Sequence, residues 1–352
     1  MLFTVRCHIL ILFFLVLMPS GQADAAPSPA GHPAVIEVGV QPLGYPAAMI
    51  GAALGHDAIL KRELEASGYL LKFVPFRKGS DMVPLMGSSL SAAIVGDMPA
   101  IRMAMQSEIC VVGVAKKTFT SVVGRNVALL AQLKRKRVAY AEGSSAHHTL
   151  LQALASVGLS ERDVRLVPMD IDAMPAALEA GRVDAFSAWE PAPTLALTRN
   201  TEGRVLFRGA SSDFLVISGK LVRNDPQAAL ALSAAMARAL NWMRKSNANL
   251  HQAALWTEKE GAALSPRQGK LTQTQVVEIT RREILDVPAA PVIVRLPGHL
   301  PLKGEFDFLK RLGKLPQDAA YQRVEQAFAY DGLQQVLKSP QRYRLGEFEY
   351  RP

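Results

Sequence analysis

The segment Val138–His148, with the sequence VAYAEGSSAHH, combines a strand, a turn and the start of a helix. The apolar run ends at Ala141, a Gly-Ser turn follows, and an apolar helix begins, so that Ser144 or Ser145 caps it. The unpaired N–H groups of the first turn and the positive end of the helix dipole favour an anion there. The same sequence also suits a plain capped helix, which needs no ligand.

The strand–turn–helix pattern recurs on both sides of this segment. Strands separated by helical stretches of about 10–15 residues indicate βαβ units and parallel sheets. Two such runs, one before about residue 120 and one from about 125 to 208, predict two α/β lobes. Open α/β sheets bind ligands at the carboxyl ends of their strands, which predicts a cleft between the lobes. The expected strands are 35–40, 70–76, 92–95, 109–114, 137–141, 164–168, 183–189 and 205–207, and the expected helices are 47–64, 81–87, 149–157 and 226–245.

The N-terminus has the pattern of a secretory signal peptide. Arg6 precedes an apolar run from Ile9 to Met18, and Ala23 and Ala25 supply small residues for cleavage. The run is too short to cross a bilayer of roughly 30 Å as a helix, so a membrane anchor is the weaker alternative. We expect residues 1–26 to be a signal peptide, 27–33 a disordered leader, and the mature protein to be soluble and periplasmic.

The charge of +9, from 40 Lys and Arg against 31 Asp and Glu in 352 residues, raises the question of a nucleic-acid partner. The basic residues are scattered without interleaved aromatic residues, and the densest run, Lys134–Arg137, is typical of a solvated turn. The sequence therefore predicts no nucleic-acid binding. With Cys7 in the signal peptide, Cys110 is left alone and no disulfide can form within one mature chain. We find no motif for a cofactor, a metal or a catalytic residue.

Two further strand ends carry polar or aromatic residues. After the strand that ends near Val95, Asp97 serves either as a helix cap, its commoner use, or as an acceptor for a ligand. Trp189, at the end of another expected strand, belongs either to the core or to the wall of a binding site.

Several segments occur in an order that resembles the periplasmic substrate-binding proteins of ABC importers, in the nitrate/sulfonate/taurine group. The similarity is greatest to the aliphatic-sulfonate-binding branch and covers about residues 35–245. It implies a two-lobed type II periplasmic-binding-protein fold, mainly of parallel sheets flanked by helices, with a ligand cleft between the lobes. Lobe one would be 34–120 plus 210–352 and lobe two 121–209, with hinge crossings near 120 and 210. The segments are Phe76–Ser80, Gly96–Pro99, Leu133–Ala139, Gly143–His147, Ala176–Ala185 and Trp189–Pro191.

The resemblance also implies a set of ligand-binding residues. Ser144, Ser145 and Ala146 would hold an anionic head, and Phe214 would close the apolar side. The sequence departs from the family at 87–92, which has an extra residue and no aspartate, and matches nothing after about residue 285. The full set is Gln41, Gly44, Tyr45, Asp97, Met98, Ser144, Ser145, Ala146, His147, Trp189, Glu190 and Phe214.

The leading interpretation is a monomeric, non-catalytic receptor that delivers a small organic anion, such as an alkanesulfonate, to the permease subunits of an ABC importer. It would bind the anion through neutral donors, without a buried cation and without a cofactor. Two alternatives stay open. One is an enzyme on the same fold, such as a pyrimidine-precursor synthase or a lyase, against which export argues. The other is a sensor module that presents its ligand to a membrane receptor.

Overall fold

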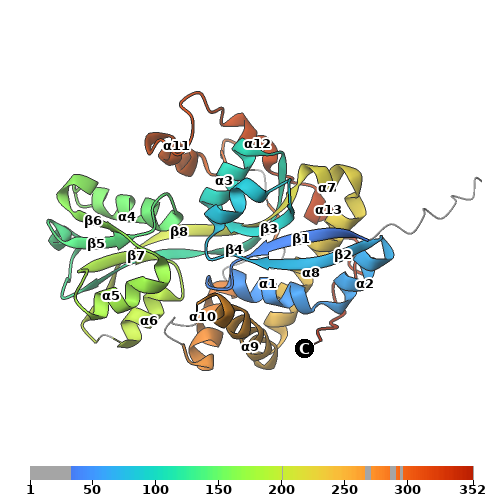
Figure 1. The fold of residues 1–352 in the computed structure, drawn as a ribbon, viewed down its shortest axis with the longest axis horizontal. Coiled ribbons are helices and arrows are strands. Elements are labelled where there is room, and N and C mark those ends of the chain that lie inside the picture. The colour runs from blue at the N-terminus through green and yellow to red at the C-terminus, as the bar shows by residue number, and fades with distance from the viewer. Residues whose placement is uncertain (1–32, 200, 266–270, 286–290, 294–295, 352) are drawn as a thin grey trace, which may run out of the picture. The chain divides into compact units, whose positions relative to one another are not determined.

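Eight strands form a single sheet in the order β2-β1-β3-β8-β4-β7-β5-β6 (Figure 1). The computed structural model describes residues 33–199, 201–265, 271–285, 291–293 and 296–351. The expected signal peptide and most of the expected leader lie outside these residues. The strands are β1 (Ala34–Val40), β2 (Tyr69–Pro75), β3 (Leu90–Gly96), β4 (Ile109–Arg125), β5 (Arg137–Tyr140), β6 (Arg165–Pro168), β7 (Ala185–Ala188) and β8 (Gly203–Ser218).

The sheet is mixed, which confirms the α/β class but replaces the expected separate parallel sheets with a continuous one. β1 pairs in parallel with β2 and β3, and β5 pairs in parallel with β6 and β7. The strands between these groups run antiparallel, with β8 against β3 and β4, and β4 against β7. The outer parts of the sheet therefore have the expected βαβ form and are joined by an antiparallel centre.

The two central strands are much longer than the sequence predicted. β4 and β8 pair from Ile109 opposite Ser218 to Arg125 opposite Gly203. We expected strands only at 109–114 and 205–207, because mostly polar stretches, 115–121 and 208–213, follow them directly; the apolar run Phe214–Ile217 at the end of β8 was missed. The polar stretches stay in the strands because backbone hydrogen bonding between β4 and β8 does not depend on apolar side chains.

Helices cover both faces of the sheet (Figure 1). Apolar side chains form four buried clusters. Two of them include residues of β1 or β3, at one end of the sheet, and two include residues of β5 or β7, toward the other end. Within the described residues, no helix is both long enough and apolar enough to cross a membrane. The α-helices are α1 (Ala47–His56), α2 (Ala58–Ala66), α3 (Asp97–Gln106), α4 (Ser145–Ala155), α5 (Met174–Glu179), α6 (Ala192–Arg199), α7 (Gly219–Asn224), α8 (Pro226–Lys245), α9 (Asn247–Leu264), α10 (Gln273–Leu285), α11 (Lys303–Arg311), α12 (Gln322–Ala327) and α13 (Gly332–Lys338).

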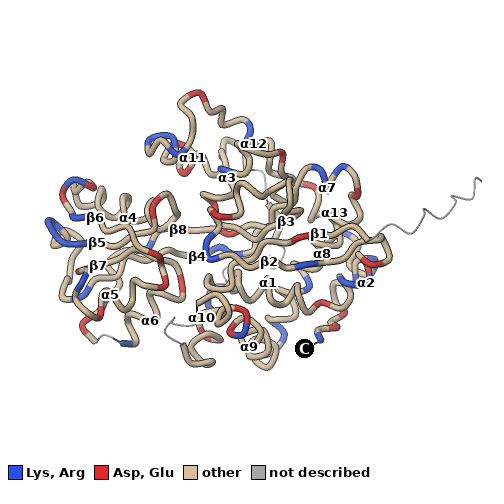
Figure 2. Tube along the Cα trace, in the orientation of Figure 1, with Lys and Arg blue, Asp and Glu red and all other residues tan. Residues whose placement is uncertain are grey.

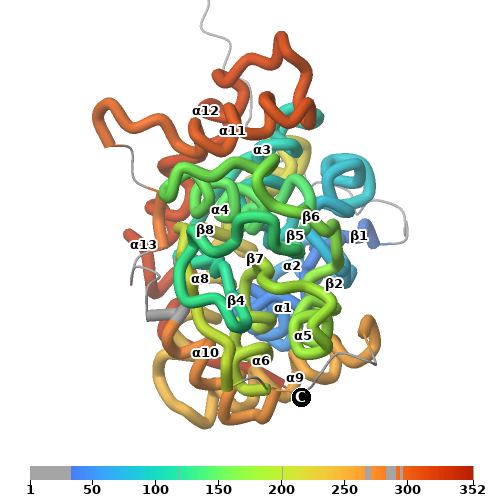
Figure 3. Tube along the Cα trace, turned by 90° about the vertical axis from the view of Figure 1, so that its left-hand side faces the viewer, coloured from blue at the N-terminus to red at the C-terminus, as the bar shows by residue number. Residues whose placement is uncertain are grey.

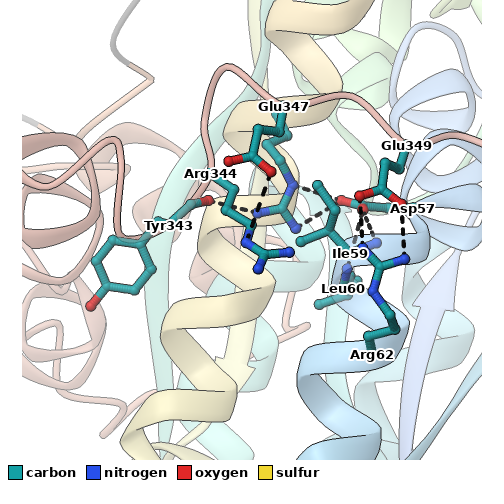
Figure 4. Close-up of polar contacts among 9 residues, drawn as sticks. Asp57, Ile59, Leu60, Arg62, Tyr343, Arg344, Glu347 and Glu349 are labelled. Atoms are coloured by element: carbon teal, nitrogen blue, oxygen red, sulfur yellow. Dashed lines mark hydrogen bonds and ion pairs between the residues drawn. The ribbon is translucent and has the colours of Figure 1, made fainter.

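Asp57 divides the single helix that we expected at 47–64 into α1 and α2. Its Oδ1 atom accepts hydrogen bonds from the N–H groups of Ile59 and Leu60 at 2.9 and 3.1 Å, which caps α2 (Figure 4). Its Oδ2 atom accepts a hydrogen bond of 2.9 Å from Nε of Arg238, on α8. Nη1 of Arg238 donates to the carbonyl of Tyr343 at 2.8 Å. One buried carboxylate thus begins a helix and helps to hold the C-terminal segment in place.

Candidate ligand-binding site

A cavity of about 610 Å³ opens where the parallel strands end. The segments that follow β1, β2, β3, β5, β6 and β7 all contribute to its wall, as expected for an open α/β sheet. The middle of β4 and β8 forms another part of the wall. The lining residues are Gln41, Leu43, Gly44, Tyr45, Arg77, Lys78, Gly79, Ser80, Gly96, Pro99, Arg102, Lys116, Ala141, Glu142, Gly143, Ser144, Ser145, Pro168, Met169, Asp170, Ile171, Asp172, Trp189, Ser211, Asp213 and Lys314.

The N-terminus of α4 presents two kinds of donor to the cavity. Ser144 is the cap: its Oγ accepts from the N–H of His147 at 3.3 Å and donates to the carbonyl of Ala141 at 2.6 Å. The hydroxyl of Ser145 has no hydrogen-bond partner among the described residues, and neither do the N–H groups of Ser145 and Ala146. Capping and anion binding are therefore compatible here, because different serines supply them.

Lys116 is a buried cation in the wall of the cavity. Only 2% of the residue is exposed, and it lies in β4 opposite Asp213 of β8. No described residue accepts a hydrogen bond from its ammonium group. The ammonium nitrogen keeps access to the open space of the cavity, where an anion could reach it. This arrangement contradicts our expectation of a site made of neutral donors alone.

Two buried carboxyl groups, those of Asp97 and Asp213, interact electrostatically with Lys116. Burial, with the negative charges of Glu305 and Asp213, raises the pKa of Asp97 to about 7, although Lys116 and a hydrogen bond from the N–H of Met98 oppose the shift. Burial also raises the pKa of Asp213, again against the effect of Lys116. The two carboxyl groups are therefore easier to protonate than ordinary aspartates, which weakens their hold on the lysine.

Other charged residues of the cavity form ion pairs across it. Arg77, after β2, pairs with Asp172, after β6, at 2.5 Å. Lys314, after α11, pairs with Glu142, after β5, at 2.9 Å. Over the rest of the molecule, Lys and Arg are spread among Asp and Glu on most elements (Figure 2). The net charge of the chain thus does not mark the site, whereas the individual basic residues in the cavity do.

An apolar part of the wall faces these charges. The Trp189 indole is half-buried, and its Nε1 lies 3.5 Å from where a Cβ on Gly44 would be, so the loop after β1 passes close to the ring. The N–H of Tyr45 donates to the carbonyl of Glu190 at 3.1 Å, which ties this loop to the segment after β7. Together with Leu43 and Met169, these residues suit the apolar portion of an organic ligand.

Half of the predicted site residues line the cavity: Gln41, Gly44, Tyr45, Ser144, Ser145 and Trp189. The other six do not. Met98 and Phe214 are buried in the core, where the Phe214 ring meets that of Phe328 at 5.9 Å. Asp97 is 3% exposed and lies behind the wall, and Ala146 is fully buried. Ligand contact by any of the twelve stays a prediction.

The remaining two residues, His147 and Glu190, make hydrogen bonds within the protein and do not line the cavity. Nδ1 of His147 accepts from the N–H of Gly143 at 3.2 Å, and burial lowers the pKa of His147 to about 4, so the ring is neutral near pH 7. Glu190 accepts from the N–H of Thr194 at 3.2 Å and pairs with Arg282 of α10 at 3.0 Å. His147 fixes the turn before α4, and Glu190 fixes the start of α6.

The sequence interpretation missed the basic residues of the cavity. Arg77 and Lys78 lay within a quoted family segment, Phe76–Ser80, but were given no role. Lys116 sits in the polar stretch that hid the middle of β4, and Lys314 lies beyond residue 285, where no resemblance guided us. A lysine in the interior of a buried strand is the one signal that could have been used, since lysines are rarely buried without a reason.

Comparison with known proteins finds sequence similarity over the middle of the chain. Residues 90–257 match the NMT1-like family. The chain is 32% identical over 167 residues to the "Putative aliphatic sulfonates-binding protein" of Escherichia coli K12, an alignment that covers 44% of this chain and 50% of the relative. It thus spans about half the length of that curated relative.

Solved structures share the fold over most of its length. The periplasmic aliphatic sulphonate binding protein SsuA of E. coli superimposes with a TM-score of 0.65 at 20% identity, over 83% of this chain and 91% of that one. The alkanesulfonate-binding protein SsuA of Xanthomonas axonopodis pv. citri, bound to MOPS, gives 0.63 at 22% identity, over 85% and 99%. The desulfurization enzyme DSZB gives 0.57 at 15% identity, over 87% and 99%.

The fold is therefore shared by binding proteins and at least one enzyme, and it does not by itself separate the two classes. The resemblance stated from the sequence is confirmed: residues 90–257 match the NMT1-like family, and the chain has the fold of the type II periplasmic binding proteins.

Proposed function

We propose that this chain is the substrate-binding protein of an ABC importer and that it captures a small organic anion, with an alkanesulfonate as the leading candidate. Lys116 carries this proposal, because it is a buried cation that lines the cavity without a hydrogen-bond acceptor among the described residues. An anionic head bound there would also accept from the hydroxyl of Ser145 and from the free N–H groups at the start of α4.

The size of the cavity favours an organic ligand over an inorganic ion. Its 610 Å³ is about twenty times the volume of one water molecule in the liquid. Nitrate would fill only a small part of that space and would leave the wall at Trp189 and Leu43 without a partner. An alkyl chain attached to the anionic head would cover this apolar wall.

A role as a receptor also fits the side chains in the cavity. Among the described residues, the lining includes neither cysteine nor histidine. Ser144, which lies just before α4, donates its hydroxyl hydrogen to the carbonyl of Ala141. It therefore does not donate that hydrogen to a histidine ring that could act as a base. We therefore favour binding over catalysis, with export to the periplasm and delivery to a membrane permease as parts of the same proposal.

Isothermal titration with butanesulfonate, taurine, nitrate and 1-butanol tests the proposal. We expect butanesulfonate to bind and 1-butanol, which lacks the charge, not to bind. Lys116→Met should weaken butanesulfonate binding about 10- to 100-fold, the effect of losing one charged hydrogen bond or more. Lys117→Met, at the exposed neighbouring position, is the matched control and should bind like the wild type. Absence of binding by every anion to a folded protein would refute the proposal.

A further inference from the structure

The segment Lys303–Leu315 packs on two helices, α3 and α4, that each contribute residues to the cavity. Its helix, α11, contacts α3 and α4, and Figures 1 and 3 show it on the face of the sheet that these two helices cover. The sequence resemblance ended well before this segment.

The packing of α11 on α4 is direct. Phe308 is 1% exposed, and its ring centre lies 4.7 Å from that of His148 and 5.4 Å from that of His147. Both histidines belong to the first turns of α4, the helix whose N-terminus faces the cavity. Burial lowers the pKa of each histidine, so neither ring adds a positive charge to this contact near pH 7. The contact is an apolar one that fixes α11 relative to the turn before α4.

The chain leaves α11 through a rigid turn. Gly313 has a φ angle of +66°, which glycine adopts without strain. The N–H of Gly313 donates to the carbonyl of Lys310 at 3.0 Å, and the N–H of Lys314 donates to that of Leu309 at 2.9 Å, the hydrogen bonds of a Schellman motif. Leu309 and Leu315, on either side of the turn, are buried. The backbone of Lys314 is therefore held firmly although its side chain is partly exposed.

The side chain of Lys314 extends from this turn to the cavity. Its Cγ and Cε atoms lie 3.8 and 3.9 Å from where a Cβ on Gly143 would be. Its Nζ atom is 2.9 Å from Oε1 of Glu142, and both residues line the cavity. The side chains of Lys314 and Glu142 are 41% and 54% exposed, so their ion pair adds little to the stability of the fold.

We propose that Lys314, held at the end of α11, completes the anion site as a second cation that raises affinity for the anionic head, and that Glu142 is the carboxylate that competes with the anion for Lys314. This inference rests on the proposed function and adds a residue to the same site. In the absence of an anion, Lys314 pairs with Glu142. When the anion binds beside Ser145, the ammonium group turns from Glu142 toward it, over the edge of Gly143.

The proposal predicts opposite effects for the two partners of one ion pair. Lys314→Gln should weaken butanesulfonate binding about 5- to 10-fold, because a cation is lost. Glu142→Gln should strengthen it about 3-fold, because the competing carboxylate is lost. In the double variant, Glu142→Gln should no longer strengthen butanesulfonate binding, because the lysine with which Glu142 pairs is absent. Arg311→Gln removes an equal charge from an exposed position on α11 and should leave affinity unchanged.

Titration calorimetry of these variants, together with their melting temperatures, tests the inference. If Lys314 served only the ion pair, both single variants would change affinity in the same direction, or neither would, and the inference would be wrong. If the wild type binds neither butanesulfonate nor taurine, the proposed function itself fails. Normal wild-type binding that Lys314→Gln leaves unchanged would overturn this inference alone.

Discussion

Two buried basic residues, Arg238 and Lys116, have opposite surroundings. Arg238 is fully buried, and the carboxylate of Asp57 and the carbonyl of Tyr343 accept its hydrogen bonds within 3 Å. Lys116 is almost as deeply buried, yet it lines a cavity and lacks an acceptor among the described residues. Removing a buried cation whose partners belong to the fold leaves the opposite charge buried alone, whereas a cation in a cavity without an acceptor in the described fold points to a ligand.

The largest effect expected from this comparison is on stability. Arg238→Met leaves the Asp57 carboxylate buried without its partner, so we expect the free energy of unfolding to fall by about 3–5 kcal/mol. Arg62→Met is the matched control, because the Arg62–Glu349 pair is exposed and its loss should cost less than about 1 kcal/mol. Urea unfolding followed by circular dichroism measures both.

The variant Arg238→Met also separates stability from binding. In the fraction of molecules that stay folded, the intrinsic affinity for butanesulfonate should match that of the wild type, in contrast to Lys116→Met. An affinity loss as large as that of Lys116→Met, measured well below the melting temperature, would break the distinction between the two residues.

A smaller effect concerns the carboxyl groups near Lys116. Because the pKa of Asp97 is about 7, its negative charge is present above that pH and largely absent below it. An anion bound at Lys116 is repelled by the ionised form, so affinity should fall as pH rises through 7, by about tenfold if the two charges interact with about 1.4 kcal/mol. Titrations between pH 5.5 and 8.5 measure this dependence.

The variant Asp97→Asn should flatten that pH profile. It should also change stability in a defined direction. The folded pKa of Asp97 lies above the unfolded value, so protonation favours the folded state, and this contribution is lost as pH rises from about 4 to about 7. The stability of Asp97→Asn, compared with that of the wild type, should therefore be higher at pH 8 than at pH 4. A pH profile of affinity unchanged by the substitution would show that other groups control it.

The smallest effects separate the two serines at the start of α4. Ser144→Ala removes the cap and should lower the free energy of unfolding by about 1 kcal/mol. Ser145→Ala removes a hydroxyl without a protein partner, so it should reduce butanesulfonate affinity about 2- to 10-fold and leave the melting temperature unchanged. Equal losses of stability and affinity in Ser145→Ala would favour the reading of this turn as a plain cap.

The sequence predicted those parts of the fold that depend on local apolar patterns. β1, β5 and α8 lie close to their expected bounds, because apolar residues recur along each with the period of a strand or helix. β4 was missed beyond Val114 and β8 beyond Phe207, where polar residues such as Lys116 and Asp213 break the apolar pattern. Lys116 and Asp213 both line the cavity, so polar residues that concealed part of the strands also mark the site.

The end of a strand was a useful but incomplete guide to the site. Gly44, Ser145 and Trp189, in the segments after β1, β5 and β7, line the cavity, whereas Asp97, which follows β3 directly, does not. His147 and Glu190 come one or two residues further along the chain, and hydrogen bonds within the protein hold them elsewhere. Lys314 could not be inferred from any local pattern, because only the packing of α11 on α4 brings it to the cavity.

The ribbon formed by β4 and β8 has a mechanical consequence. It is the structural link that runs through the sheet between the β1–β3 group and the β5–β7 group, and its pairing is irregular between Val114 and Lys116. Any rotation of one group against the other has to be absorbed as twist of this ribbon. A charged residue near the axis of such a rotation moves far less than a residue in either outer group of strands. Lys116 would therefore keep its position while the walls on both sides moved, and an approaching anion would meet the same electrostatic target in every state.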